Sequence, residues 1–285
     1  MSRLFLGLPA PAKLNLFLHV VGQRADGYHE LQSVFVPIDL ADLLDFERRD
    51  DGVIERTGDV IGDVAGDLAV RAAQSLQQAS GVDWGVTINV EKRIPAGSGM
   101  GGGSSDAATT LLALNRLWDL HWPRVRLSEL ALGLGADVPF FLGRGPAFVE
   151  GIGERLTPLS FAPRTFAVIH PQVAVSTREI FTDSGLTRDT KPTIIAAFSA
   201  AQETLSQRFF GANDLEAVVR RRYPVVDRAF SHLQRFGEAR MTGSGAAVFL
   251  AAADADHATS AIEGLPEGWR GWVVHSLVEH PLAGW

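Results

Sequence analysis

The chain has 285 residues, with 26 Lys and Arg against 33 Asp and Glu, a net charge of -7 and no cysteine. Hydrophobic residues make up 46% of it and charged residues 21%, which is enough apolar material for one large domain or two of ordinary size and excludes a disordered chain. The missing cysteines exclude disulfides, thiolate metal sites and cysteine nucleophiles. The net negative charge argues against a protein that binds nucleic acid mainly by neutralising its phosphates.

No run of about 18 apolar residues occurs, so the sequence predicts no membrane-spanning helix. The apolar stretch 4–8 is too short for a secretory signal, whose apolar region needs roughly 7–15 residues. We therefore expect a cytoplasmic protein, a monomer or a homodimer, with no membrane or nucleic-acid partner.

The first half of the chain combines strand and helix patterns. β-Branched and aromatic runs predict strands. Asp67 and Gly81 bracket a run of helix formers that predicts a helix. Leu111, Leu114 and Trp118 recur at helical spacing and predict a second one. The predicted strands cover 15–21, 33–40, 43–47 and 86–91, and the predicted helices cover 67–81, 104–118 and 128–134.

The pattern starts again near residue 158. Strands and helices occur in both parts, with no linker of biased composition between them, which indicates an α+β fold of two tightly joined halves. We expect an N-terminal domain over 1–158 and a C-terminal domain over 159–285. In the second half we expect strands over 166–171 and 271–280, helices over 213–236 (with a bend at Pro224) and 254–264, and a buried strand or helix over 246–253.

A glycine-rich segment connects a predicted strand to a predicted helix. Five glycines fall within residues 97–103, where backbone N–H groups could face an anion at the partly positive N-terminus of a helix. A turn without a ligand needs only one or two glycines, because each further one costs backbone entropy. Asp106 would repel a phosphate unless Mg²⁺ or a basic residue lay between them. The expected phosphate-binding residues are Pro95, Ala96, Gly97, Ser98, Gly99, Met100, Gly101, Gly102, Gly103, Ser104 and Ser105.

Three known nucleotide-binding patterns can be compared with this segment. The Walker pattern needs Gly-Lys followed by Ser or Thr, and the chain has no Gly-Lys pair. Gly97, Gly99 and Gly102 match the dinucleotide pattern G-x-G-x-x-G, but the residues after the predicted helix do not resemble the second parallel strand of a Rossmann unit. The His-Arg-Asp and Asp-Phe-Gly motifs of protein kinases are missing. The segment predicts phosphate binding without identifying the ligand.

Four segments together resemble a known enzyme family. PAGSGMGGGSSDAA, at 95–108, resembles the second motif of the GHMP kinases, the superfamily of galactokinase, homoserine kinase, mevalonate kinase and phosphomevalonate kinase. The segments 11–40, 135–154 and 241–249 resemble the 4-diphosphocytidyl-2-C-methyl-D-erythritol kinases of that superfamily, in the right order over nearly the whole chain. The glycine segment alone would indicate only the superfamily.

This resemblance implies a two-domain architecture, with a ribosomal S5 domain 2-like N-terminal half, a ferredoxin-like C-terminal half and the active site in the cleft between them. ATP would bind at the glycine segment. Its γ-phosphate would pass to the 2-hydroxyl of 4-diphosphocytidyl-2-C-methyl-D-erythritol, a step of the non-mevalonate isoprenoid pathway. Mg²⁺ would accompany ATP, because phosphoryl transfer uses this ion to bridge phosphate oxygens and offset developing charge.

Lys13 and Asp137 match the catalytic pair of this family, with Asp137 as the base and Lys13 keeping it ionised and orienting the hydroxyl. Lys13 is one of three lysines in a chain that otherwise uses arginine, which suggests a need for a compact ammonium. From the residues alone, Lys13 is as readily a surface cation, and Asp137 as readily the cap of a turn before Pro139.

The resemblance also assigns residues to the substrate. Tyr28 would stack on the cytosine, His29 would bond to its edge, and Phe181 would complete the stack from the other half. The alternatives are an exposed loop at Tyr28 and His29, and a Phe181 packed inward. Asn15 would contact the methylerythritol hydroxyls. The residues expected to line the cleft near the transferred phosphate are Thr242, Gly243 and Ser244.

The same residues distinguish this function from the alternative functions. Another superfamily kinase, acting on mevalonate or homoserine, would have no use for a base-stacking segment at 28–29. A ligand-binding regulator without catalysis would not need both Lys13 and Asp137. The histidines lack metal-ligand spacing, so we expect no metal bound by the protein itself.

Overall fold

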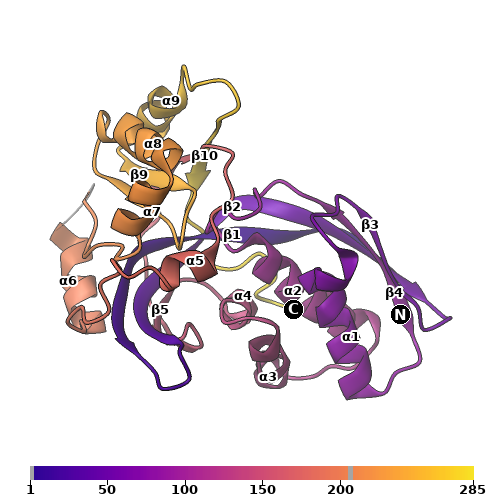
Figure 1. Ribbon diagram of the computed structural model, residues 1–285. Helices are drawn as coiled ribbons and strands as arrows, with labels where there is room; N and C mark the ends of the chain where they lie inside the picture. The colour runs from indigo at the N-terminus through magenta and orange to yellow at the C-terminus, as the bar shows by residue number, and fades with distance from the viewer. Residues whose placement is uncertain (1–2, 205–207) are drawn as a thin grey trace.

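The computed structural model describes residues 3–204 and 208–285, which form two β-sheets and the helices packed on them (Figure 1). In the larger sheet β3, β4, β2, β5 and β6 lie side by side in this order, and β1 pairs with β2. All these pairs are antiparallel except β3 with β4. The strands are β1 (Leu4–Gln23), β2 (His29–Arg49), β3 (Ile54–Gly58), β4 (Gly85–Glu91), β5 (Ala147–Gly151) and β6 (Arg155–Pro158).

β1 and β2 form a long hairpin that arches across the whole molecule in Figure 1. The predicted break between strands 33–40 and 43–47 is wrong: Ala41 and Asp42 pair with Pro11 and Ala10 of β1, so β2 continues through them. The ladder shifts register at several points, one of them between Pro11 and Lys13. Such bulges bend and twist a strand, which lets the hairpin reach both halves.

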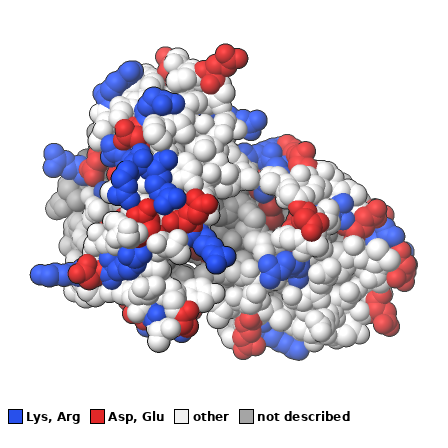
Figure 2. Space-filling model, viewed as in Figure 1, with Lys and Arg blue, Asp and Glu red and all other residues white. Residues whose placement is uncertain are grey.

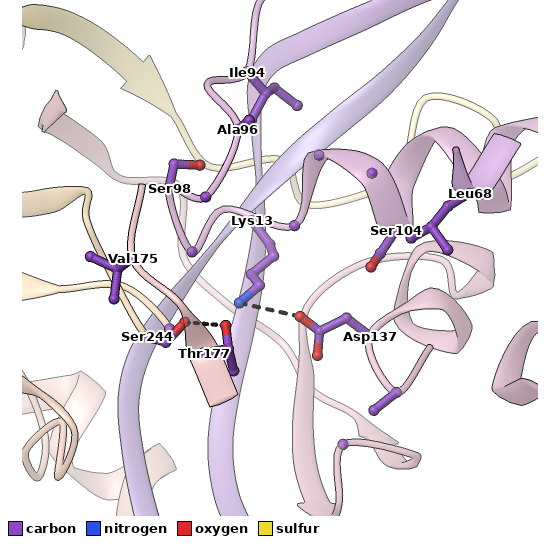
Figure 3. A pocket seen from close by; sticks show the side chains of 18 of the residues that line it. Lys13, Leu68, Ile94, Ala96, Ser98, Ser104, Asp137, Val175, Thr177 and Ser244 are labelled. Carbon is purple, nitrogen blue, oxygen red and sulfur yellow. Dashed lines mark hydrogen bonds and ion pairs between the residues drawn. The ribbon is translucent and has the colours of Figure 1, made fainter. Parts of the chain in front are cut away.

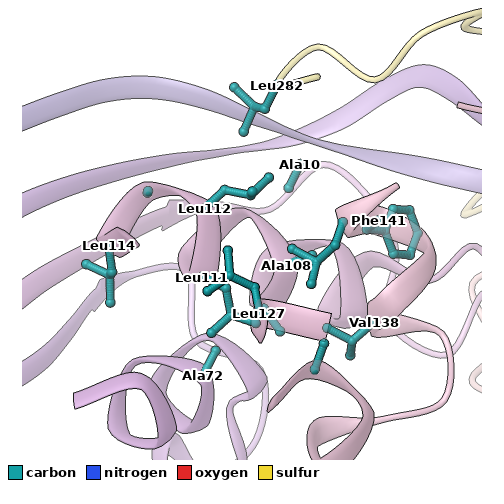
Figure 4. Packing of buried hydrophobic residues seen from close by; sticks show 14 of the residues in the cluster. Ala10, Ala72, Ala108, Leu111, Leu112, Leu114, Leu127, Val138, Phe141 and Leu282 are labelled. Carbon is teal, nitrogen blue, oxygen red and sulfur yellow. The ribbon is translucent and has the colours of Figure 1, made fainter. Parts of the chain in front are cut away.

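Helices α1 and α2 pack against the larger sheet, and α3 and α4 pack on these two helices. Asp67 caps α1 by accepting from two N–H groups of its first turn, and Gly81 ends it with a φ of 69°, as the sequence predicts. Helix α2 is buried along nearly all its length, and Figure 4 shows Leu111, Leu112 and Leu114 in the core around it. The helices are α1 (Leu68–Ser80), α2 (Gly102–Leu117), α3 (Arg124–Leu134) and α4 (Val138–Leu142), with a short 3₁₀ turn at Val64–Gly66.

The smaller sheet has the antiparallel order β10-β7-β9-β8. This order belongs to a split βαβ unit, the arrangement of ferredoxin-like folds, so the expected α+β architecture is confirmed. The predicted helix over 213–236 is two helices, because Pro224 cannot continue α7 and starts α8 instead. The elements are β7 (Thr165–His170), β8 (Ala239–Met241), β9 (Val248–Ala252), β10 (Arg270–His275), α5 (Thr177–Phe181), α6 (Ile195–Thr204), α7 (Glu216–Arg222), α8 (Pro224–Gln234) and α9 (Ala255–Ile262).

The two sheets share a hydrophobic core. Side chains alternate along β7: Ala167 and Ile169 face the core built with α7, α8 and α9, whereas Phe166 and Val168 pack toward the β1–β2 hairpin. Leu14 of β1 lies in that second cluster. The halves are therefore joined by buried apolar surface and not by a flexible linker.

The end of the chain returns to the first half. β10 stops at His275 and not at residue 280 as predicted, because Ser276 bridges to Ile38 and the chain leaves the smaller sheet there. Leu282 then packs into the core around α2, and Arg124 of α3 donates to its carbonyl oxygen. Residues 276–285 thus contribute to the half of the molecule formed by β1–β6.

Candidate active site

A cavity of about 580 Å³ lies between the two halves, within the size range of small-molecule sites. The surface is hollowed at this place in Figure 2. Lys13, Asp137 and the glycine segment line the cavity from the first half, while Thr177 and Ser244 line it from the second (Figure 3). Residues from both halves of the chain therefore meet around one space that could hold a ligand.

The glycine segment is held by the β8–β9 connection of the other half. Ala246 donates its N–H to the carbonyl oxygen of Gly97 at 3.1 Å, and Ala247 donates to that of Ser98 at 3.0 Å. Gly99 has a φ of 77°, and a Cβ there would lie 2.2 Å from the carbonyl oxygen of Thr242. Glycine is required at this position because two backbones meet there.

The segment ends at the N-terminus of α2. Gly101 occupies the cap position and supplies no side-chain acceptor, so the N–H groups of the first turn are available to an anion. Most of the expected phosphate-binding residues line the cavity, among them Gly102, Gly103 and Ser104. Met100 and Ser105 do not, because both are fully buried in the core. Helix α2 starts two residues before the predicted 104, which adds two glycine N–H groups to this end.

Lys92 is a residue of the site that sequence reasoning missed. It lines the cavity and donates to Asp106 Oδ2 at 2.7 Å and to a carboxylate oxygen of the fully buried Asp42. Burial raises the pKa of Asp106 to about 7, and the ammonium of Lys92 opposes that rise by pairing with the carboxylate. A basic residue therefore offsets the repulsion expected from Asp106. The scarcity of lysine that marks Lys13 would have marked Lys92 equally.

Lys13 is buried and not a surface cation. Its Nζ lies 3.6 Å from Asp137 Oδ2, donates to Asn15 Oδ1 and sits 4.6 Å from the centroid of the Phe35 ring. The backbone N–H of Lys13 donates to the carbonyl oxygen of Met100 at 2.9 Å, and this bond joins β1 to the glycine segment. Burial lowers the pKa of Lys13, and the nearby Asp137 carboxylate opposes that change.

Asp137 faces the cavity toward Lys13 (Figure 3). It stands at the cap position of α4, yet its side chain accepts no hydrogen bond from the first turn of that helix. The side chain is 34% exposed, so one carboxylate oxygen can meet a ligand while the other pairs with Lys13. The turn-capping interpretation of Asp137 is therefore wrong for its side chain.

Asn15 and Thr242 are engaged with each other and with the protein. Asn15 donates its Nδ2–H to Ser33 Oγ at 3.0 Å, and Thr242 Oγ1 lies 3.1 Å from Asn15 Oδ1. Asn15 lines the cavity, but the fully buried Thr242 does not. Gly243 and Ser244 do line it. Ser244 Oγ shares a hydrogen bond of 2.7 Å with Thr177 Oγ1 of α5, a residue that the sequence did not single out.

The residues expected to bind the cytosine ring are only partly brought together in the structure. The rings of His29 and Phe181 face each other with centroids 5.0 Å apart and planes inclined by 32°. Phe181 lines the cavity, whereas His29 is not a lining residue and packs its ring on Phe181. Tyr28 is 60% exposed and is not a lining residue, so the structure does not place it against Phe181. Arg188, which sequence reasoning missed, donates to His29 Nε2 at 3.0 Å.

Some arrangements are missing from the ranges that the structure describes, 3–204 and 208–285. In these residues no helix is long and apolar enough to cross a membrane. In the same residues no three His, Asp or Glu side chains converge in a way that could hold a metal ion.

The fold and the cavity define a GHMP kinase. The model of the GHMP kinases N terminal domain matches residues 67–145, and that of the GHMP kinases C terminal domain matches residues 194–271. Together these two matches include the whole glycine segment and α2, as well as the β8–β9 connection that holds the segment.

Within this superfamily, the chain belongs to the 4-diphosphocytidyl-2-C-methyl-D-erythritol kinases. It is 54% identical to the protein of that name from Ralstonia pickettii (strain 12J) over 277 residues, covering 96% of this chain and 95% of the relative. It is 50% identical to the one from Azoarcus sp. (strain BH72) over 284 residues, covering 99% of this chain and 98% of the relative.

Solved structures agree with this family. A crystal structure of 4-(cytidine 5'-diphospho)-2C-methyl-D-erythritol kinase superposes with a TM-score of 0.82 and 38% identity, over 94% of this chain and 98% of that one. A homoserine kinase from Cytophaga hutchinsonii shares the fold with a TM-score of 0.69 at 16% identity, over 98% of this chain and 96% of that one.

Proposed function

We propose that this chain transfers the γ-phosphate of ATP to the 2-hydroxyl of 4-diphosphocytidyl-2-C-methyl-D-erythritol, giving the 2-phosphate and ADP. The observation that carries the proposal is the pair of buried Lys13 and partly exposed Asp137, which shares one cavity with the uncapped N-terminus of α2. The acceptor follows from the name that the relatives share. Its role in the non-mevalonate isoprenoid pathway follows from the same activity.

The phosphates of ATP would lie on the glycine segment. The N–H groups of Gly102, Gly103 and Ser104 and the partial positive charge of α2 suit them. No set of three acidic or histidine side chains in the described residues offers a metal cage. Mg²⁺ would come bound to ATP and would offset charge on the phosphates, and the Ser104 hydroxyl, which lines the cavity, could serve as one of its ligands.

Asp137 would accept the proton of the 2-hydroxyl as the oxygen attacks the γ-phosphate. Lys13 lies 3.6 Å from its carboxylate and would keep it ionised. The buried ammonium is also close enough to Asn15 to be held in one direction. Both side chains come from rigid elements, β1 and the start of α4, which favours precise positioning.

The cytosine would enter beside Phe181, with His29 at its edge and Tyr28 closing over it. We place Asn15 near the methylerythritol portion and Gly243 and Ser244 near the transferred phosphate, because these residues line the cavity. Thr242 would support this region from behind, through Asn15. We further propose that the domains divide at residue 158 and that the protein acts in the cytoplasm as a monomer or homodimer.

Replacing Tyr28 by Ala is expected to raise the KM for the cytidine substrate about tenfold or more and to leave the KM for ATP unchanged. Loss of stacking on one base costs roughly 1–3 kcal/mol, and the exposed Tyr28 side chain makes little contribution to the fold. Steady-state kinetics with each substrate varied in turn measures both constants. Equal changes in the two KM values would exclude a stacking role.

The product itself tests the reaction. Phosphorus NMR of the product formed from the cytidine substrate should show a new phosphomonoester coupled to no proton, since C2 of the methylerythritol portion carries none. A phosphomonoester coupled to methylene protons would place the phosphate on a primary hydroxyl and contradict the proposed position.

A further inference from the structure

Arg188 lies in the segment that follows α5. Its side chain contacts both His29 and Phe181, the two residues expected to hold the cytosine from opposite halves of the chain. Its guanidinium is fixed by backbone carbonyl groups, so its direction is determined by the fold. It donates to the carbonyl oxygens of Phe181 at 3.0 Å, Asp183 at 2.8 Å and Leu186 at 3.1 Å. A further donor, Nε–H, points to His29 Nε2 at 3.0 Å, across to β2 of the first half.

The chemistry of this contact settles which nitrogen of His29 carries a proton. A guanidinium has five N–H donors and no acceptor. Nε2 must therefore accept with its lone pair, which leaves Nδ1 as the protonated nitrogen of a neutral ring. Among the described residues Nδ1 makes no hydrogen bond within the protein, so its N–H is left for a ligand.

The charges around His29 support a neutral ring. Burial, followed by the charge of Arg188, lowers the pKa of His29. The neighbouring carboxylates are occupied elsewhere and do not oppose this. Asp26 pairs with Arg24, Asp183 pairs with Arg221 and Arg222, and the Glu30 side chain lies over Gly22. The face of the ring packs on Phe181, and its backbone pairs with the uncharged Gln23 of β1.

We propose that Arg188 is a positioning residue of the cytidine site, which holds the His29 ring against Phe181 with the proton on Nδ1. This inference rests on the proposed function in so far as the ligand is a cytosine. The Nδ1–H group suits an acceptor on the base edge, such as N3 of cytosine. Uracil carries a proton on N3, so the same donor would disfavour it.

The tautomer can be measured without any substrate. In ¹⁵N-labelled protein, long-range proton–nitrogen correlation should show His29 with a protonated Nδ1 and an unprotonated Nε2 at neutral pH, and with a pKa below the usual histidine value of about 6.5. In Arg188→Ala the ring should lose the fixed tautomer, and its pKa should rise relative to the wild type because the charge of Arg188 is removed. A wild-type His29 with its proton on Nε2 would overturn the proposal, whether or not the variant folds.

The kinetic consequence has a distinctive pH dependence. At pH 8, Arg188→Ala should raise the KM for the cytidine substrate about tenfold relative to wild type, with the KM for ATP unchanged. Protonation of the ring in the variant supplies the Nδ1–H donor, so the ratio of the variant KM to the wild-type KM for the cytidine substrate should be smaller at pH 6 than at pH 8. A purely structural loss would give a ratio independent of pH and would contradict the proposal.

Arg221→Ala is the matched control for this experiment. It removes an ion pair to Asp183 in the same segment but does not touch His29, so its KM ratio should stay near one at both pH values. Should the wild-type chain turn over no cytidine compound, the proposed function fails while the NMR result still decides the contact of Arg188 with His29. A correct tautomer combined with an unchanged KM in Arg188→Ala would overturn the positioning role alone.

Discussion

Asp137→Asn should lower kcat by about 10²–10⁴ and leave both KM values close to those of the wild type. The amide has nearly the same shape but cannot accept the proton of the attacking hydroxyl. The fold should tolerate the change, because the Asp137 side chain caps no helix and pairs only with Lys13 among the described residues. Steady-state kinetics at saturating Mg²⁺-ATP measures kcat directly, and thermal unfolding checks that the variant is folded.

The matched control for Asp137→Asn is Asp227→Asn on α8. Asp227 is similarly exposed and also pairs with a basic residue, Arg220, but it lies outside the cavity. Its kcat should not change. If Asp137→Asn kept a normal kcat, another group would have to be the base. If it instead raised both KM values strongly, Asp137 would have a binding or structural role.

Gly99→Ala should destabilise the protein by roughly 2–5 kcal/mol, which combines the cost of a left-handed alanine with that of overpacking. The added Cβ would lie 2.2 Å from the carbonyl oxygen of Thr242, and 3.0 Å from that of Gly245. Neither backbone can yield without breaking the hydrogen bonds that join the glycine segment to the β8–β9 connection. The melting temperature should fall on the order of 10 °C, and ATP affinity with it.

Gly103→Ala tests the same segment without the clash. Gly103 lies in the first turn of α2 without a positive φ, and its added Cβ would meet only Leu68 Cδ1, at 3.6 Å. Because alanine favours a helix over glycine by about 1 kcal/mol, the melting temperature should stay the same or rise. Equal melting temperatures for Gly99→Ala and Gly103→Ala would show that flexibility, and not the approach of two backbones, explains the glycines.

Much of the fold follows from local patterns. Asp67 and Gly81 predicted α1 because capping is a local property of the sequence, and the apolar spacing around Leu111 predicted α2. The missed elements depend on distant partners. β3 gains its structure from parallel pairing with β4, and the short β8 from pairing with β9. The continuity of β2 likewise depends on Asp42 being paired and buried, which no local pattern indicates.

The residues of the site likewise fall into those that the sequence indicates and those that depend on distant partners. The glycine segment could be recognised from composition, and Lys13 from the rarity of lysine in this chain. The contacts of Lys92 and Arg188 could not, because their partners Asp42 and His29 are 50 and 159 residues away. Tyr28 shows the opposite case: the resemblance assigns it to the base, whereas in the structure its side chain is exposed at the tip of the hairpin.

The most direct test of the proposed function is phosphoryl transfer from Mg²⁺-ATP with one acceptor per reaction: 4-diphosphocytidyl-2-C-methyl-D-erythritol, mevalonate or homoserine. Release of ADP should occur with the cytidine compound and stay at background with the other two. Turnover of mevalonate or homoserine instead would keep the superfamily and remove the roles of Tyr28, His29 and Phe181. Binding of ATP without turnover of any of the three would contradict the central claim that this chain is a kinase of that substrate.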